Sequence, residues 1–212
     1  MVVAPFVGFQ LPFEALTFVA TVFGCTVASL ILLLGGFSGA YINPAITVAS
    51  GLAGGLKRRL IVPYLAFQVT GGLLAGLSLK GVFGSFSSFA DLGSTKLAPA
   101  VTPVEGVVIE MAGTFVLAFS ALYASTNIRG RRWQATLVGA TLLMLIMLIG
   151  PLTGASFNPA RSLGPSLFSG YFANQYVYWF GPIVGAGSAG LIFRAVKNRL
   201  RATNGHRIVC LC

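Results

Sequence analysis

Hydrophobic positions in this 212-residue chain gather into long apolar runs. Each run is close to the roughly 20 residues that an α-helix needs to cross a lipid bilayer. Residues 1–10 are apolar too, but this segment is too short to cross a bilayer. The pattern predicts an all-α membrane protein with five full transmembrane helices, at residues 15–34, 60–79, 104–124, 133–149 and 175–195.

Composition and charge placement support this interpretation. Hydrophobic residues make up 56% of the chain and charged residues 8%, against about 25% charged residues in soluble domains. If the run at 15–34 crosses towards the cytoplasm, alternate crossings place most basic residues on one side of the membrane. That side is cytoplasmic by the positive-inside rule. The basic residues concerned are Lys57, Arg58, Arg59, Arg129, Arg131, Arg132, Arg194, Lys197, Arg199, Arg201 and Arg207.

The net charge of +10 is therefore a topology signal, and no nucleic-acid partner is expected. We expect a multi-pass integral membrane protein whose tail, residues 196–212, lies in the cytoplasm. The plasma membrane and an internal membrane both remain alternatives.

Groups for metal binding or catalysis are scarce. The single histidine, His206, lies in the tail, and the chain has four acidic residues. Cys25 lies within an apolar run, whereas Cys210 and Cys212 end the chain, so a disulfide framework is not expected. The two tail cysteines belong either to a frayed terminus or to a lipidated one. We expect no metal site, no cofactor and no enzymatic activity.

A repeated motif stands out: SGAYINPAIT at residues 38–47 and TGASFNPARS at residues 153–162. Asn is a favoured helix N-cap, Pro is favoured at the first helical position, and Ala is the best helix former. Each copy thus predicts a helix start. The helices that follow are short, because the first reaches Gly54 and Gly55 and the second ends at Gly170. Both are predicted to dip partway into the membrane as half-helices.

Three apolar runs separate Asn43 from Asn158, and this odd number sends the two half-helices in from opposite faces, as in an inverted repeat. Their asparagine ends should meet near the midplane, each carrying the positive end of a helix dipole. Each cap would use its side-chain oxygen on the backbone and leave its NH₂ free to donate. Such a site suits neutral, oxygen-bearing molecules and repels cations.

These features resemble the aquaporins (major intrinsic proteins), whose pore is built around two Asn-Pro-Ala half-helices. The resemblance covers about residues 15–195 and extends to IEMAGTF around Glu110, AFQVTGG around Gln68, and WFGPIVGAGSAG at residues 179–190. It implies supporting roles for Glu110 and Gln68, with Glu110 holding the loop of the second half-helix through hydrogen bonds; a proton relay is the alternative role for Glu110. The pore motifs that it implies are Asn43, Pro44, Ala45, Asn158, Pro159 and Ala160.

By this resemblance the five runs match the second to sixth helices of the family, and the first helix is expected to be missing, through truncation or a misplaced start. The chain is expected to form one aquaporin-like channel domain, residues 1–212, with the less stable part at 15–34 and 38–55. Its subdivisions are an N-terminal remnant at 1–14, a first repeat at 15–103, a second repeat at 104–195 and the tail at 196–212.

The family's spacing from each asparagine implies a selectivity filter of Phe23, Ile146, Ala155 and Arg161. Arg161 would donate hydrogen bonds and repel cations, although a salt bridge to Glu110 is the alternative. Strict water channels of the family usually carry His at the position of Ile146, and glycerol channels carry a second aromatic residue at that of Ala155. The set matches neither pattern and is closest to the archaeal-type filter. Other residues favour the water-channel branch by this resemblance: Ser162, Ser166, Tyr178 and Trp179.

Two functions from different classes remain. The first is a passive channel for water, and for small neutral solutes such as ammonia and hydrogen peroxide, that excludes protons and ions. Family members are usually homotetramers in the lipid bilayer, and the same is expected here. The alternative is a poorly conducting membrane scaffold or adhesion protein with the same fold. An ion-coupled transporter is weaker, because no acidic residue is expected at the midplane.

Overall fold

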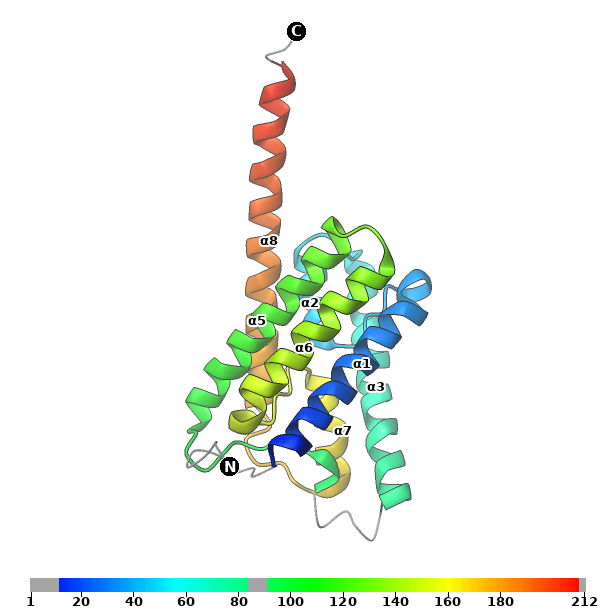
Figure 1. Ribbon diagram of the computed structural model, residues 1–212, viewed down its shortest axis with the longest axis vertical. Coiled ribbons are helices and arrows are strands. Elements are labelled where there is room, and N and C mark those ends of the chain that lie inside the picture. Colours follow the sequence, from blue (N-terminus) through cyan, green and yellow to red (C-terminus); the bar gives the residue numbers. More distant parts are fainter. Residues whose placement is uncertain (1–11, 84–90, 210–212) are drawn as a thin grey trace.

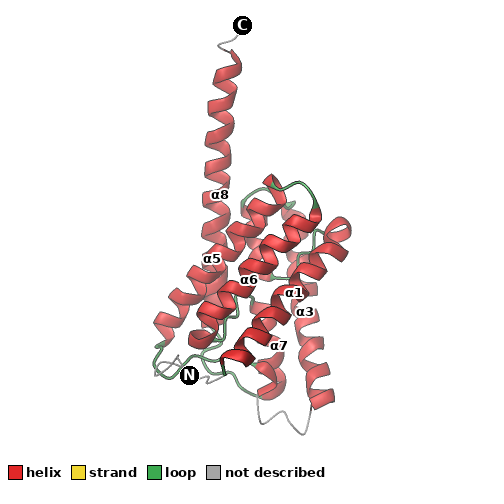
Figure 2. Cartoon of the chain, viewed as in Figure 1, coloured by secondary structure: helices red, strands yellow, loops and turns green. Residues whose placement is uncertain are grey.

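The computed structural model describes residues 12–83 and 91–209 of the chain. Within these residues the structure is entirely helical, with seven α-helices and one short 3₁₀ turn (Figures 1 and 2). The elements are α1 (Phe13–Ser38), α2 (Pro44–Leu52), α3 (Arg58–Phe83), η2 (Asp91–Gly93), α5 (Pro103–Asn127), α6 (Arg131–Thr153), α7 (Pro159–Ser169) and α8 (Val177–Val209).

Five of these helices are long and apolar enough to cross a membrane: α1, α3, α5, α6 and the first part of α8. This confirms the five predicted spans, although each helix extends beyond the apolar run that predicted it. The largest difference is in α8, which continues to Val209 and projects well beyond the bundle (Figure 1). Residues 194–202 are rich in Arg, Lys, Leu and Ala, which favour a helix even without packing partners.

The bundle contains the predicted inverted repeat. The order span, half-helix, span occurs first as α1, α2, α3 and again as α6, α7, α8. The first spans of the two repeats, α1 and α6, pack side by side. Their contact is close because a Cβ built on Gly24 would lie 2.7 Å from the carbonyl oxygen of Gly139, and one on Gly139 would lie 2.6 Å from that of Gly24.

Each half-helix packs against the last span of the other repeat, so that α2 lies against α8 and α7 against α3. Glycines make both contacts possible. A Cβ on Gly190 of α8 would lie 2.5 Å from the carbonyl oxygen of Ala49 in α2, and one on Gly72 of α3 would clash with the carbonyl oxygen of Ala160 in α7. The remaining span, α5, packs along α8 and also contacts α6.

The spans differ in how far the described residues cover them. In the most apolar stretch of α1 and of α3, 11% of the residues are buried, compared with 39% in α5. The apolar side chains of α1 and α3 are therefore available to lipid or to further protein.

The two ends of the bundle carry different sets of charged side chains. The end from which α8 projects carries basic residues at the start of α3, around the start of α6 and along α8: Lys57, Arg58, Arg59, Arg129, Arg131, Arg132, Arg194, Lys197 and Arg199. The opposite end carries both signs, as Glu14, Lys80, Asp91, Lys96 and Glu105. The separation agrees with the predicted topology, whereas the cytoplasmic position of the basic end stays a prediction.

Candidate pore

Asn43 and Asn158 cap the two half-helices, as the motif predicts. The Oδ1 atom of Asn43 accepts a hydrogen bond from the backbone N–H of Ala45 at 2.9 Å. That of Asn158 accepts from the N–H groups of Ala160 at 3.0 Å and Arg161 at 3.3 Å. Pro at the first helical position of both half-helices has no N–H to leave unpaired, which favours these helix starts. The pore motifs therefore form two capped helix N-termini.

The two N-termini meet through reciprocal hydrogen bonds. Nδ2 of Asn43 donates to the carbonyl oxygen of Phe157 at 2.8 Å, and Nδ2 of Asn158 donates to that of Ile42 at 3.2 Å. Each asparagine thus bonds the residue that precedes the other asparagine. Each NH₂ group, which the cap leaves free to donate, uses one N–H on the opposite loop, because the two ends come close enough to bond. An amide carries two N–H donors, so one donor of each side chain is left for the pore.

Glu110 holds the loop that precedes the second half-helix. Its carboxylate accepts hydrogen bonds from the hydroxyl of Thr153 at 2.7 Å and from the backbone N–H groups of Ser156 at 2.9 Å and Phe157 at 2.8 Å. The loop has Ala155 at φ 45° and Phe157 at φ 53°, a conformation that is uncommon for residues other than glycine. The supporting position expected for Glu110 is thus present, and its three bonds compensate the local backbone strain.

Gln68 of α3 has a corresponding position at the first half-helix. Its Nε2 donates to the carbonyl oxygen of Tyr41 at 2.8 Å and to the hydroxyl of Thr47 at 2.7 Å. These contacts tie the loop before Asn43, and the helix after it, to α3. Two side chains from different spans, Gln68 and Glu110, therefore fix the two loops in place.

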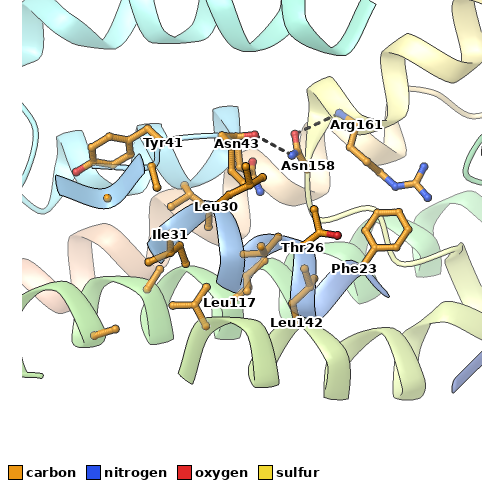
Figure 3. Close-up of a pocket in the computed structure, with 18 of the residues that line it drawn as sticks. Phe23, Thr26, Leu30, Ile31, Tyr41, Asn43, Leu117, Leu142, Asn158 and Arg161 are labelled. Carbon is orange, nitrogen blue, oxygen red and sulfur yellow. Dashed lines mark hydrogen bonds between the residues drawn. The ribbon is translucent and has the colours of Figure 1, made fainter. Parts of the chain in front are cut away.

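A cavity of about 610 Å³ runs past both asparagines. Its wall comes from α1, α2, α5, α6 and α7, and its lining is mainly apolar. Figure 3 shows Phe23, Thr26, Leu30 and Ile31 of α1 along one side, with Leu117 of α5 and Leu142 of α6 nearby. All four residues of the predicted filter line this cavity, together with Asn43 and Asn158: Phe23, Ile146, Ala155 and Arg161.

Arg161 is held from two sides. Its guanidinium lies over the ring of Phe23, 5.3 Å from the ring centroid (Figure 3), a cation–π arrangement. Its Nη1 donates to the carbonyl oxygen of Gly93 at 2.9 Å, and its Nε is buried without a partner among residues 12–83 and 91–209. The alternative of a salt bridge to Glu110 is not observed, because both oxygens of that carboxylate bind the loop. Among the described residues the ion pair is between Lys96 and Asp91.

Three backbone carbonyls in this region were not anticipated from the sequence: those of Ile42, Phe157 and Gly93. They accept the bonds from Asn158, Asn43 and Arg161, respectively. A backbone group has no side-chain signature, so only the fold identifies it. The run LGSTKLAP at residues 92–99, unusually polar for this chain, was the one available signal for Gly93.

Comparisons with known proteins agree with this architecture. The model of the major intrinsic protein family matches residues 3–193. The chain is 37% identical to Aquaporin NIP1-1 of Zea mays over 184 residues, which is 84% of this chain and 62% of the maize protein. It is 39% identical to the lens fiber major intrinsic protein of Gallus gallus over 199 residues, covering 88% of this chain and 74% of that protein.

A solved structure, the aquaglyceroporin from Plasmodium falciparum, matches with a TM-score of 0.73 and 18% sequence identity. The match covers 89% of this chain and 84% of the other, which shows a common fold. The chain spans less than two thirds of the length of the plant relative above. The match to the family model and the inverted pair of Asn-Pro-Ala half-helices lead to one conclusion: this chain belongs to the major intrinsic protein family.

Proposed function

We propose that the protein is a passive channel for water and for small neutral solutes, and that it excludes protons and ions. The observation that carries this proposal is the meeting of two half-helix N-termini in one cavity, bonded through Asn43 and Asn158. This site offers N–H donors and no titratable side chain, so it suits a molecule that accepts hydrogen bonds and carries no charge. The path involves no chemical conversion, and we propose no enzymatic activity.

Exclusion of cations follows from the same geometry. Each half-helix carries about half a positive elementary charge at its N-terminus, and both N-termini point to the middle of the cavity. Arg161 adds a full positive charge further along the wall. A water molecule that accepts from both free amide donors has used its lone pairs and accepts no proton from its neighbours. Protons and metal cations therefore meet an electrostatic barrier that water does not.

The filter sets the range of neutral solutes. Ile146 and Ala155 offer no side-chain hydrogen bonds, so the polar groups of this region are Arg161 and nearby carbonyls. The constriction that Phe23, Ile146, Ala155 and Arg161 border is wider and less polar than one with His at position 146. Water, ammonia and hydrogen peroxide fit this environment, whereas glycerol should pass poorly. This assigns the chain to the water-conducting branch of the family.

The proposal extends to assembly and orientation. The exposed apolar faces of the spans suit a homotetramer in the bilayer, with one pore in each subunit. The basic end of the bundle, including the projecting part of α8, belongs on the cytoplasmic side by the positive-inside rule. A protease applied to sealed, oriented vesicles tests this placement by cleaving the tail from one side only.

One observation favours the second candidate, a poorly conducting scaffold. The α1 and α3 spans are little covered by the rest of the described chain, with 11% of their apolar stretches buried. If the pore wall were incomplete at these spans, lipid could reach the pore. Conduction would then be impaired although the fold is kept. Flux measurements separate the two candidates.

The test is osmotic shrinkage of proteoliposomes, followed by stopped-flow light scattering. Thr26 lines the cavity, and Thr26→Trp should obstruct it and lower the shrinkage rate nearly to that of empty vesicles. Leu33 lies on the same helix but is 75% exposed and outside the cavity, so Leu33→Trp is the matched control. A channel predicts loss of flux in the first variant alone. Equal rates in wild type, both variants and empty vesicles would favour the scaffold.

A further inference from the structure

Residues 91–98, which follow α3 and precede α5 in the chain, form a polar strap. The strap lies at the end of the bundle opposite the projecting part of α8. Three contacts attach it to the second repeat. The backbone N–H of Ala98 donates to the carbonyl oxygen of Leu152 at 2.8 Å. The hydroxyls of Thr95 and Ser162 bond at 2.9 Å, and those of Ser94 and Ser169 bond at 3.0 Å. The strap is therefore pinned to α6 and along α7, the helix that carries Arg161.

The strap begins with an unfavourable backbone turn. Asp91, Leu92 and Gly93 have φ angles of 42°, 54° and 75°, so three consecutive residues adopt the left-handed conformation. This conformation is disfavoured for residues with a side chain. The carbonyl oxygen of Asp91 accepts from the N–H of Ser94 at 3.0 Å and from its hydroxyl at 2.6 Å, which closes the turn. The turn persists because the surrounding contacts hold it.

An ion pair reinforces the turn. The Lys96 ammonium pairs with the Asp91 carboxylate, so the pair joins the residues on either side of Gly93. The same ammonium lies 4.5 Å from the ring centroid of Tyr171, in the loop after α7. The side chains of Lys96 and Asp91 are 28% and 27% exposed. Lys96 thus links the strap to itself and to the loop that follows α7.

The turn matters for the pore because Gly93 supplies the carbonyl that binds Arg161. The guanidinium lies between this carbonyl and the Phe23 ring, and no described residue accepts from its Nε. If Gly93 moved, the Arg161 side chain would lose this acceptor and gain rotamer freedom. The distance from Arg161 to Phe23 would then vary, and the width of the constriction that these side chains border would vary with it.

We propose that the Asp91–Lys96 pair and the Thr95–Ser162 bond are positioning contacts that set the solute cut-off of the pore. They act through the carbonyl of Gly93, which fixes the guanidinium of Arg161 against Phe23. This inference rests on the proposed channel function and assigns a selectivity role to side chains outside the pore wall. None of Asp91, Lys96 and Thr95 lines the cavity.

The test compares water and glycerol permeability of the same proteoliposomes. Lys96→Met keeps an aliphatic chain of similar length and removes the charge, and Asp91→Asn removes the opposite charge. Both should raise the ratio of glycerol to water permeability, by up to about fivefold for a partly exposed ion pair, and leave water permeability within about twofold of wild type. Lys80→Met and Glu14→Gln are matched controls at the same end of the bundle and should leave the ratio unchanged.

Two further variants separate positioning from general damage. Thr95→Val removes one hydroxyl while keeping the side-chain shape, and it should raise the ratio without any change in charge. The double variant Asp91→Lys with Lys96→Asp restores an ion pair of opposite polarity and should recover part of the wild-type ratio. Loss of stability alone would lower both permeabilities together and would not respond to the charge exchange.

The outcomes distinguish this inference from the function on which it rests. Suppose that wild type conducts water and Arg161→Val raises the glycerol ratio, but Lys96→Met, Asp91→Asn and Thr95→Val all match the controls. The positioning role is then wrong and the channel function stands. A failure of the charge exchange to recover any of the ratio would likewise reject the ion pair. Wild-type vesicles that shrink no faster than empty vesicles would overturn the function and this inference together.

Discussion

The guanidinium carbon of Arg161 lies 5.3 Å from the centroid of the Phe23 ring, so a charge on the second half-helix faces an aromatic ring on the first described span (Figure 3). The two residues come from opposite halves of the inverted repeat, α7 and α1. Between them they border the cavity that passes Asn43 and Asn158. This pairing places a fixed positive charge beside the proposed path.

Replacing that charge should weaken the barrier to cations. In Arg161→Val the wall loses its positive charge and its bond to Gly93, whereas the half-helix dipoles remain. We expect water permeability to persist and proton or sodium leak to rise. Ion flux into vesicles under a set membrane potential measures the effect. An unchanged leak would mean that the dipoles alone form the barrier.

Ile146 should control the passage of neutral solutes other than water. It lines the cavity and is buried, and Ile146→His would introduce a hydrogen-bonding ring that narrows the gap. Water permeability should be preserved, while the permeability to ammonia and hydrogen peroxide falls. The comparison uses wild type, this variant and Leu33→Trp as a control on the lipid side. If the solute profile stays the same, Ile146 does not border the constriction.

Glu110 should be needed mainly for stability. Its buried carboxylate accepts bonds from Thr153, Ser156 and Phe157. Glu110→Gln replaces one oxygen with a donor and leaves an N–H or O–H without an acceptor, at a cost of about 1–3 kcal/mol. Thermal unfolding in detergent should show a clear drop in Tm. Glu14→Gln, at an exposed position, should change stability by less than about 0.5 kcal/mol.

The first repeat should open more readily than the second. The sequence predicted weaker protection at 15–34 and 38–55; the structure supports this expectation at α1, does not support it at α2, and adds α3, whose apolar stretch is as little buried as that of α1. In the region 38–55, α2 is mostly buried and packs against α8. Hydrogen exchange in detergent should therefore be faster in α1 and α3 than in α5, with α2 slow. Equal protection of α1 and α5 would contradict this account.

Much of the fold follows from the sequence because each step rests on a strong local signal. A long apolar run has one stable form in lipid, a helix, and the five spans were predicted on that basis. The Asn-Pro pair marks a helix start, and both half-helices begin at the predicted residue. The odd number of spans between the motifs then fixes their opposite entry.

The finer geometry of the site depends on tertiary contacts that carry no local signal. The bonds from Asn43 and Asn158 to the opposite loops, and the bond from Arg161 to Gly93, all end on backbone carbonyls. Which carbonyl faces the pore is decided by left-handed residues such as Phe157, where tertiary contacts override local preference. Family spacing identified four side chains that line the cavity, but it did not reveal the strap whose Gly93 carbonyl binds Arg161.

The most direct test of the central claim measures water and proton flux in the same proteoliposomes, with light scattering for volume and a trapped pH-sensitive dye for protons. We predict that wild-type vesicles shrink much faster than empty ones after an osmotic step, while an imposed pH gradient decays no faster than in empty vesicles. Shrinkage at the rate of empty vesicles, or a pH gradient that collapses along with rapid shrinkage, would contradict a proton-excluding water channel.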